Sequence, residues 1–355
     1  MTGRLETLLG IDVPIVLGPF GGLSSVALTA AVSRLGGLGS YGLYGYDAER
    51  IARTAAELRA ATDRPFALNL WLETGDEVRP GDVDLTAARA ATAPFFAELG
   101  VARPADPPRF LPDVEEQLHA ALDARPAVLS VVYGVPPRWV VETAHERGTR
   151  VIGTATTVDE ARALADGGVD AVVASGAEAA GHRVSFLHRA DDALVGTFAL
   201  VPQVVDAVRV PVLAAGGVAD RRGVAAARAL GAHGVVVGTA FLATRQSAAN
   251  DAHRAAIAAS PAHGTVLTRA MSGRLSRGVP NRAVRAIEAA AQADPAAIAP
   301  FPAQNWLTGR FRAEAGPRGV GELQSLWVGQ AAGLARHDDA GAVFAELAAG
   351  LRVEQ

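Results

Sequence analysis

The chain has 355 residues, a formal net charge of −4 and no cysteine, and all 33 of its basic residues are arginine because lysine is absent. The missing cysteines exclude disulfides, thiolate metal sites and cysteine nucleophiles, and the missing lysines exclude a lysine Schiff base. The acidic balance gives no electrostatic reason to expect nucleic acid as a partner. No apolar stretch approaches the roughly 20 residues of a membrane-spanning helix, and no secretory signal is evident. We therefore expect a cytoplasmic protein without a membrane partner.

Over the first two-thirds of the chain, short apolar runs alternate with Ala-rich amphipathic stretches. The runs are nearly continuous in apolar character instead of alternating, which is typical of parallel strands buried on both faces. Strands are predicted at Pro14–Gly18, Gly37–Tyr41, Pro65–Leu70, Ala127–Tyr133, Arg150–Ala155, Val169–Ala174, Pro211–Ala215 and Gly234–Gly238. Helices are predicted at Ser25–Leu35, Asp47–Ala61, Asp113–Asp123, Pro137–Arg147, Thr157–Gly167, Val201–Val208 and Arg221–Leu230. Eight strand–helix repeats favour an α/β fold of the (β/α)8 TIM barrel type.

Two regions depart from this alternation. The segment 71–112 is long and rich in Pro and Asp, and it predicts a loop that covers the barrel after strand three, with a short helix at Leu85–Leu99. After Arg245 the pattern is mainly helical. We expect residues 1–245 to form the barrel and residues 246–355 to form an appended, mainly helical C-terminal subdomain with a closing helix.

Glycines follow two of the predicted strands at the end where barrel enzymes build their sites. They lie in Ala214-Ala-Gly-Gly-Val218 and Val235-Val-Val-Gly-Thr-Ala-Phe241. Such glycines allow backbone N–H groups to point at one anion, as in the phosphate sites of flavin-binding barrels. The alternative is that they only make tight turns. The two motifs in the expected order favour phosphate binding.

The segment Ser175–Arg183 places His182 directly after another buried strand, among glycine and alanine residues. Imidazole can remove or hold a proton near neutral pH, so His182 is the candidate catalytic residue. Glu178 could orient His182 or cap a loop, and Arg183 could be an ordinary surface residue. The other histidines show no metal-ligand spacing, so no metal site is expected.

These motifs resemble the nitronate monooxygenases, formerly called 2-nitropropane dioxygenases, and in particular their class I members. The resemblance runs nearly end to end. Its main elements are Pro14–Gly22, Gly36–Ser40, Asn69-Leu70, Ser130–Gly134, Val151–Thr156, Glu178–Arg183, Pro211–Thr244, Ser272-Gly-Arg274, Asn281-Arg282 and Leu326–Gln330.

The resemblance implies an FMN cofactor across the barrel mouth, with the phosphate held by Gly217 and the stretch 236–239. His182 matches the family's catalytic histidine, which takes the α-proton of a nitroalkane or holds the nitronate anion. The implied reaction with O2 yields a carbonyl compound and nitrite without added NAD(P)H. Cofactor-binding residues are expected at Gly18, Pro19, Phe20, Asn69, Ser175, Gly176, Ala180, Gly181, Gly216, Gly217, Val236, Val237, Gly238 and Thr239.

Three positions depart from the family pattern. Ser175 stands where Gln is usual, and its shorter side chain cannot repeat every contact of an amide. Ala180 replaces Gly and would be strained if that position needs a positive φ. Phe20 replaces the commoner Met. These changes bear on the substrate more than on the cofactor, and a flavin monooxygenase recruited to a biosynthetic pathway would look similar.

Two other functions remain open from the residues. One is an NAD(P)H-dependent FMN reductase of enoyl thioesters or quinones on the same barrel, and the other is a barrel that binds a phosphorylated metabolite without redox chemistry. In all three cases the partner is a small molecule, and a nitronate monooxygenase also uses O2. Trp71 and Tyr133 are the expected walls of the substrate pocket. The sequence allows a homodimer but does not determine the oligomeric state.

Overall fold

The computed structural model describes residues 3–352, and its largest sheet is a barrel of eight parallel strands. The strand order is β1-β9-β8-β6-β5-β4-β3-β2, and a parallel bridge between Val16 and Leu38 joins the two ends of that order. The strands are β1 (Ile15–Leu17), β2 (Gly39–Gly42), β3 (Phe66–Trp71), β4 (Val128–Val132), β5 (Arg150–Ala155), β6 (Ala171–Ser175), β8 (Val212–Ala215) and β9 (Gly234–Val237). Each lies within two residues of a predicted strand at both ends. The predicted TIM barrel is confirmed.

Helices surround the barrel, as expected when parallel strands are connected by right-handed crossovers. They are α1 (Arg4–Leu9), α2 (Val26–Arg34), α3 (Ala48–Ala61), α5 (Val114–Asp123), α6 (Arg138–Glu146), α7 (Val158–Asp166), α8 (Thr197–Ala207), α9 (Arg221–Ala229) and the short α10 (Thr239–Leu242). The predicted helix Val201–Val208 began one turn too late. In the structure α8 begins at Thr197, whose N–H donates to the carboxylate of Glu178, distant in sequence. Within the described residues no helix is long and apolar enough to cross a membrane.

The tail was predicted to be mainly helical, and it also contains a small antiparallel sheet. Its order is β10-β11-β7, formed by β10 (Val266–Thr268), β11 (Ser276–Gly278) and β7 (Gly181–His182) from the loop after β6. The helices of the tail are α11 (Asp251–Ala259), α12 (Arg282–Ala293), α13 (Ala303–Ala315) and α14 (Ala340–Ala349), with single 3-10 turns at Ala262–Gly264, Pro295–Ala297, Gly321–Leu323 and Ala332–Leu334. The sheet ties the tail to the barrel.

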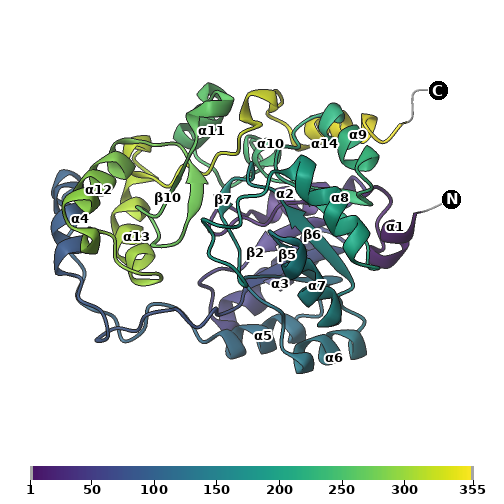
Figure 1. Cartoon of the computed structure of the whole chain (residues 1–355), viewed down its shortest axis with the longest axis horizontal. Coiled ribbons are helices and arrows are strands. Elements are labelled where there is room, and N and C mark those ends of the chain that lie inside the picture. Colours follow the sequence, from purple (N-terminus) through teal and green to yellow (C-terminus); the bar gives the residue numbers. More distant parts are fainter. Residues whose placement is uncertain (1–2, 353–355) are drawn as a thin grey trace.

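A second hydrophobic core lies beside the barrel and is formed by α12, α13 and α4 (Thr86–Leu99). Helix α4 belongs to the segment 71–112, so this segment leaves the barrel and crosses to the C-terminal helices, as the long connection at the lower left of Figure 1 shows. Phe95 and Phe96 of α4 pack against Phe311 of α13, with ring centroids 5.4 and 5.6 Å apart. Helix α14 returns to the barrel and contacts α2 and α9. The division of the chain at residue 245 stays a prediction.

We expect Phe311→Ala to lower the free energy of unfolding by about 3–5 kcal/mol, because its ring is fully buried between α4 and α13 and truncation leaves a cavity. Phe198→Ala is the matched control, since Phe198 is 76% exposed and its loss should change stability by less than about 0.5 kcal/mol. Urea unfolding monitored by circular dichroism measures both. Equal effects of the two substitutions would contradict this account of the second core.

Candidate active site

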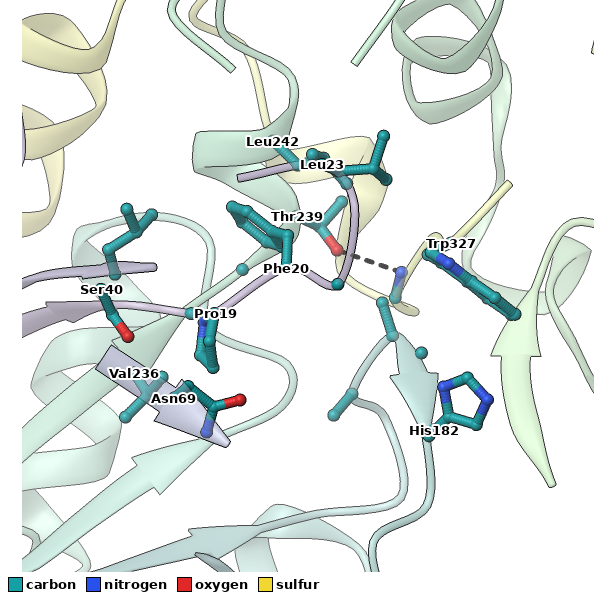
Figure 2. Close-up of a pocket in the computed structure, with 18 of the residues that line it drawn as sticks. Pro19, Phe20, Leu23, Ser40, Asn69, His182, Val236, Thr239, Leu242 and Trp327 are labelled. Carbon is teal, nitrogen blue, oxygen red and sulfur yellow. Dashed lines mark hydrogen bonds between the residues drawn. The ribbon is translucent and has the colours of Figure 1, made fainter. Parts of the chain in front are cut away.

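A cavity of about 800 Å³ opens at the carboxyl ends of the barrel strands and is walled on its far side by residues of the C-terminal tail. Figure 2 shows Pro19 and Asn69 on one side and His182 and Trp327 on the other. Most of the predicted site residues line this cavity: Gly18, Pro19, Phe20, Asn69, Trp71, Ser175, Ala180, Gly181, His182, Gly216, Gly217, Val236, Gly238 and Thr239. The fold therefore brings together residues from the whole length of the barrel.

Three predicted residues lie outside the cavity lining. The Val237 side chain is fully buried in the core between barrel and helices. Gly176 packs against Thr197, leaving no room for a β-carbon. Tyr133 lies behind Trp71, with ring centroids 5.0 Å apart, and its φ of 73° is unusual for a residue other than glycine. Tyr133 thus supports the wall that Trp71 forms.

The glycine loops after β8 and β9 form a polar cradle at one end of the cavity. Gly216 and Gly217 have φ values of 94° and 74°, which residues with a β-carbon rarely adopt. Within residues 3–352, the backbone N–H groups of Gly217 and Gly238 donate no hydrogen bond to the protein. The Gly329 N–H donates to the Thr239 hydroxyl over 3.1 Å and so brings the tail against the same cradle (Figure 2). Free backbone donors on a glycine loop suit a phosphate group.

His182 reaches the cavity from β7, where it is paired with Ser276 of β11. Its Nε2 lies 2.8 Å from the Ser272 hydroxyl, which donates its hydrogen to the Arg274 carbonyl over 3.0 Å. Because that hydroxyl has only one hydrogen, it accepts from Nε2–H of His182. The neutral ring therefore keeps its unprotonated nitrogen at Nδ1.

An aromatic wall surrounds the imidazole. The Trp71 ring meets it edge-on with centroids 4.9 Å apart, and the Trp327 ring lies at 5.3 Å. Burial, together with the positive charges of Arg274 and Arg312, lowers the pKa of His182 to about 3. His182 is thus a neutral imidazole at physiological pH.

The two arginines near His182 differ in their partners. Arg274 donates to Asp76 and Glu77, each over 2.6 Å, and its guanidinium lies over the rings of Tyr133 and Phe301. It therefore fixes the beginning of the segment 71–112 to the tail. Arg312 of α13 lines the cavity itself and forms no ion pair with any described carboxylate.

The contacts of Glu178 and Arg183 show which of the roles considered from the sequence each residue has. Glu178 accepts from the N–H and the hydroxyl of Thr197, and so caps α8 rather than orienting His182. Arg183 is buried and donates to the backbone carbonyls of Ser175 and Gly176, over 3.1 and 2.7 Å. It braces the turn after β6 from inside and is not a surface residue.

The departures at Ser175 and Ala180 fit the backbone without strain. The positive φ in this segment falls on Gly181, at 75°, and not on Ala180. Ser175 is buried at the end of β6 and lines the cavity. Asn69 is held in place by donating to the carbonyl and hydroxyl of Ser130, over 3.2 and 3.1 Å. The barrel side of the cavity is therefore built from small and fixed polar groups.

A family model described as nitronate monooxygenase matches residues 3–350. The chain belongs to this family. It is 41% identical to a protein named nitronate monooxygenase from Pseudomonas aeruginosa, over 99% of this chain and all of that protein. It is 37% identical to one from Paraburkholderia phytofirmans, over 98% of this chain and 94% of that protein. The resemblance found from the motifs is thus confirmed.

Solved structures show the same architecture. A structure described as nitroalkane oxidase from Streptomyces ansochromogenes has a TM-score of 0.85 and 34% identity, covering 98% of both chains. FabK from Thermotoga maritima has a TM-score of 0.77 and 28% identity, covering 99% of this chain and 96% of that one. Nitronate monooxygenases are flavin-dependent enzymes, and this chain is an enzyme of that family.

Three residues that line the cavity or contact His182 in this nitronate monooxygenase family member were not assigned a role from sequence. Trp327 and Ser272 lay in segments of the resemblance, but neither spacing nor residue type connected them with His182. Arg312 is one of 33 arginines, and nothing in its local pattern sets it apart. Their roles depend on contacts between residues far apart in the chain.

The lowered pKa of His182 should make the fold sensitive to acid. The unfolded chain binds this proton near pH 6.5 and the folded protein only near pH 3, so the stability contributed by neutral His182 is present above about pH 6.5 and is lost as the pH falls. Between pH 7.5 and 4.5 we expect His182→Asn to lose about 2–3 kcal/mol less stability than the unsubstituted protein. Urea unfolding at both pH values measures it, with exposed His119→Asn as the control. An identical acid loss in His182→Asn and the unsubstituted protein would rule out this titration.

Proposed function

We propose that this protein oxidises alkyl nitronates with O2 to a carbonyl compound and nitrite, using FMN. The observation that carries the proposal is a neutral histidine, His182, on an aromatic wall that faces a glycine cradle across one cavity. The names of the relatives, nitronate monooxygenase and nitroalkane oxidase, support the same substrate class.

The charges around His182 favour an anionic substrate. A histidine with a pKa of about 3 is a weak base toward a neutral nitroalkane. The cavity also carries the positive charge of Arg312, and its lining carboxylate, Glu178, is hydrogen-bonded to Thr197. A nitronate is already deprotonated and brings a negative charge to the side of the cavity where only the positive charges of Arg274 and Arg312 act on His182. We therefore place the preformed nitronate ahead of the neutral nitroalkane as substrate.

The residues at the strand ends fit a flavin mononucleotide. The unpaired N–H groups of Gly217 and Gly238 would hold its phosphate, and the small residues Gly18, Ala180 and Gly181 leave room for a planar ring along the cavity wall. When bound, FMN supplies the electron-accepting chemistry, with O2 as co-substrate. The chain's own contribution is to orient the nitronate against His182 and to exclude water with the rings of Trp71 and Trp327.

The competing proposal is an NAD(P)H-dependent flavin reductase on the same scaffold. The likeness to FabK is the observation that favours it. Anaerobic mixing distinguishes the two. Our proposal expects the flavin absorbance near 450 nm to be bleached by a nitronate and to be unaffected by NADH or NADPH. Rapid bleaching of the flavin by NADH or NADPH would contradict nitronate oxidation and favour the NAD(P)H-dependent reductase. Chromatography of the cofactor released by heat identifies it as FMN or as another flavin.

We expect His182→Asn to keep its flavin and to lose about 10²-fold in kcat/KM on neutral 1-nitrobutane, the low end of general-base effects, because a weak proton acceptor is removed. On the preformed nitronate of 1-nitrobutane the loss should be less than about tenfold, since no proton has to be removed. Nitrite release measures both substrates. His119→Asn, far from the cavity, should match the unsubstituted enzyme. Full activity of His182→Asn on both substrate forms would remove His182 from the reaction.

A further inference from the structure

Arg312 differs from Arg274 and Arg183 in how its charge is balanced. Arg274 forms ion pairs with Asp76 and Glu77, and the negative charges of Glu160 and Glu178 partly offset the lowering of the pKa of Arg183 by burial, whereas no described carboxylate acts on Arg312. Its Nη1 donates to the Ser325 hydroxyl over 2.8 Å, and its Nη2 donates to the carbonyl and the side-chain oxygen of Asn305. All three acceptors are uncharged. Among the described residues Nε has no hydrogen-bond partner, and no carboxylate lies within ion-pair distance. The guanidinium is therefore a half-buried cation whose Nε is shielded from water, and it has no counter-charge.

Such an arrangement is costly for the fold alone. A buried charge is normally paired, because removing it from water costs several kcal/mol that hydrogen bonds to neutral groups offset only in part. Arg274 shows the usual solution, since Asp76 and Glu77 both receive its hydrogens. Burial lowers the pKa of Arg312 to about 10, which still leaves it protonated at neutral pH. Its position in the cavity wall indicates that the missing anion comes from a ligand.

The location of Arg312 identifies what it can meet. It lies on α13 and lines the same cavity as His182, and the positive charge of Arg312 is close enough to lower the pKa of that imidazole. Its partner Asn305 donates to the Tyr44 hydroxyl over 2.8 Å, which fixes the guanidinium beside the aromatic wall. The glycine cradle is made by other elements, β8, β9 and the loops that follow them. An anion at Arg312 therefore lies close to His182 and is held by elements other than those of the cradle.

We propose that Arg312 binds the oxygens of the substrate's nitronate group and thereby selects the anion over the neutral nitroalkane. This inference rests on the function proposed above. A nitronate is planar and carries its charge on two oxygens, as a carboxylate does, and a guanidinium is the side chain best matched to that shape. In this arrangement His182 contacts the carbon end of the nitronate group, and Arg312 binds its two charged oxygens.

The test uses a carboxylate as an unreactive mimic of the nitronate. Pentanoate copies the shape and charge of the nitronate of 1-nitrobutane, and pentanamide copies its shape without the charge. Calorimetric titration of the flavin-loaded protein should show pentanoate binding at least about tenfold more tightly than pentanamide. This comparison needs no variant. Equal binding of the two compounds would overturn the proposal.

Variants then assign the effect to Arg312. Arg312→Gln keeps polar groups for Ser325 and Asn305 but removes the charge, and it should weaken pentanoate binding and lower kcat/KM on the nitronate by about 10- to 100-fold. Activity on neutral 1-nitrobutane should fall less, the reverse of the pattern for His182→Asn. Arg312→Lys should recover part of the loss. The control is Arg310→Gln, since Arg310 is exposed on the same helix and should behave as the unsubstituted protein.

The outcomes separate this inference from the proposed function. Pentanoate binding that depends on Arg312, without nitrite release from any nitronate, would keep the anion site and reject nitronate oxidation. Nitrite release with unchanged pentanoate binding in Arg312→Gln would keep the oxidation and reject the role of Arg312. Loss of the flavin from Arg312→Gln would also reject it, because the arginine would then serve the cofactor. If Arg312→Gln does not fold, the comparison of pentanoate with pentanamide decides.

Discussion

The antiparallel pairing of β7 with β11 is the interaction on which the active site depends. It joins two residues of the loop after β6 to a strand almost a hundred positions later, and it sets His182 opposite Ser276. Without it, the barrel would supply a cradle of glycines but no fixed imidazole. The same pairing brings Ser272 within hydrogen-bond distance of the ring, so one short sheet determines both the position and the tautomer of the histidine.

The two parts of the molecule contribute different chemistry to the cavity. The barrel provides small residues and free backbone donors, which suit a planar group with a phosphate. The tail after residue 245 provides the ring of Trp327, which faces Trp71 of β3 across His182, and the cation of Arg312, and its Ser272 hydroxyl is hydrogen-bonded to His182. The segment 71–112 connects them twice, because α4 packs into the second core and Asp76 and Glu77 hold Arg274 near the site. The cavity is thus an interface between two cores, and its polar groups are held from both sides.

The sequence allowed the barrel to be predicted because most strands are nearly continuous apolar runs, and burial on both faces favours that pattern wherever the strand lies. The glycine loops and His182 could be found for a similar reason: they follow strands directly. The strands of the small sheet could not be found, since β7, β10 and β11 have only two or three residues and no local periodicity. The start of α8 depended on Glu178, nineteen residues earlier, and Arg312 depended on the absence of a carboxylate, which no local pattern reveals.

The low pKa of His182 and the unpaired charge of Arg312 are two consequences of one constraint. Burial disfavours the charged form of both groups, so the imidazole stays neutral while the guanidinium, whose intrinsic pKa is far higher, stays charged. The neutral His182 therefore carries a lone pair and lies within the positive field of Arg274 and Arg312. An anion entering there relieves both groups at once: it pairs with Arg312, and its charge makes protonation of His182 easier. A neutral molecule of the same shape does neither, so the preference for a charged substrate follows from the burial of the site.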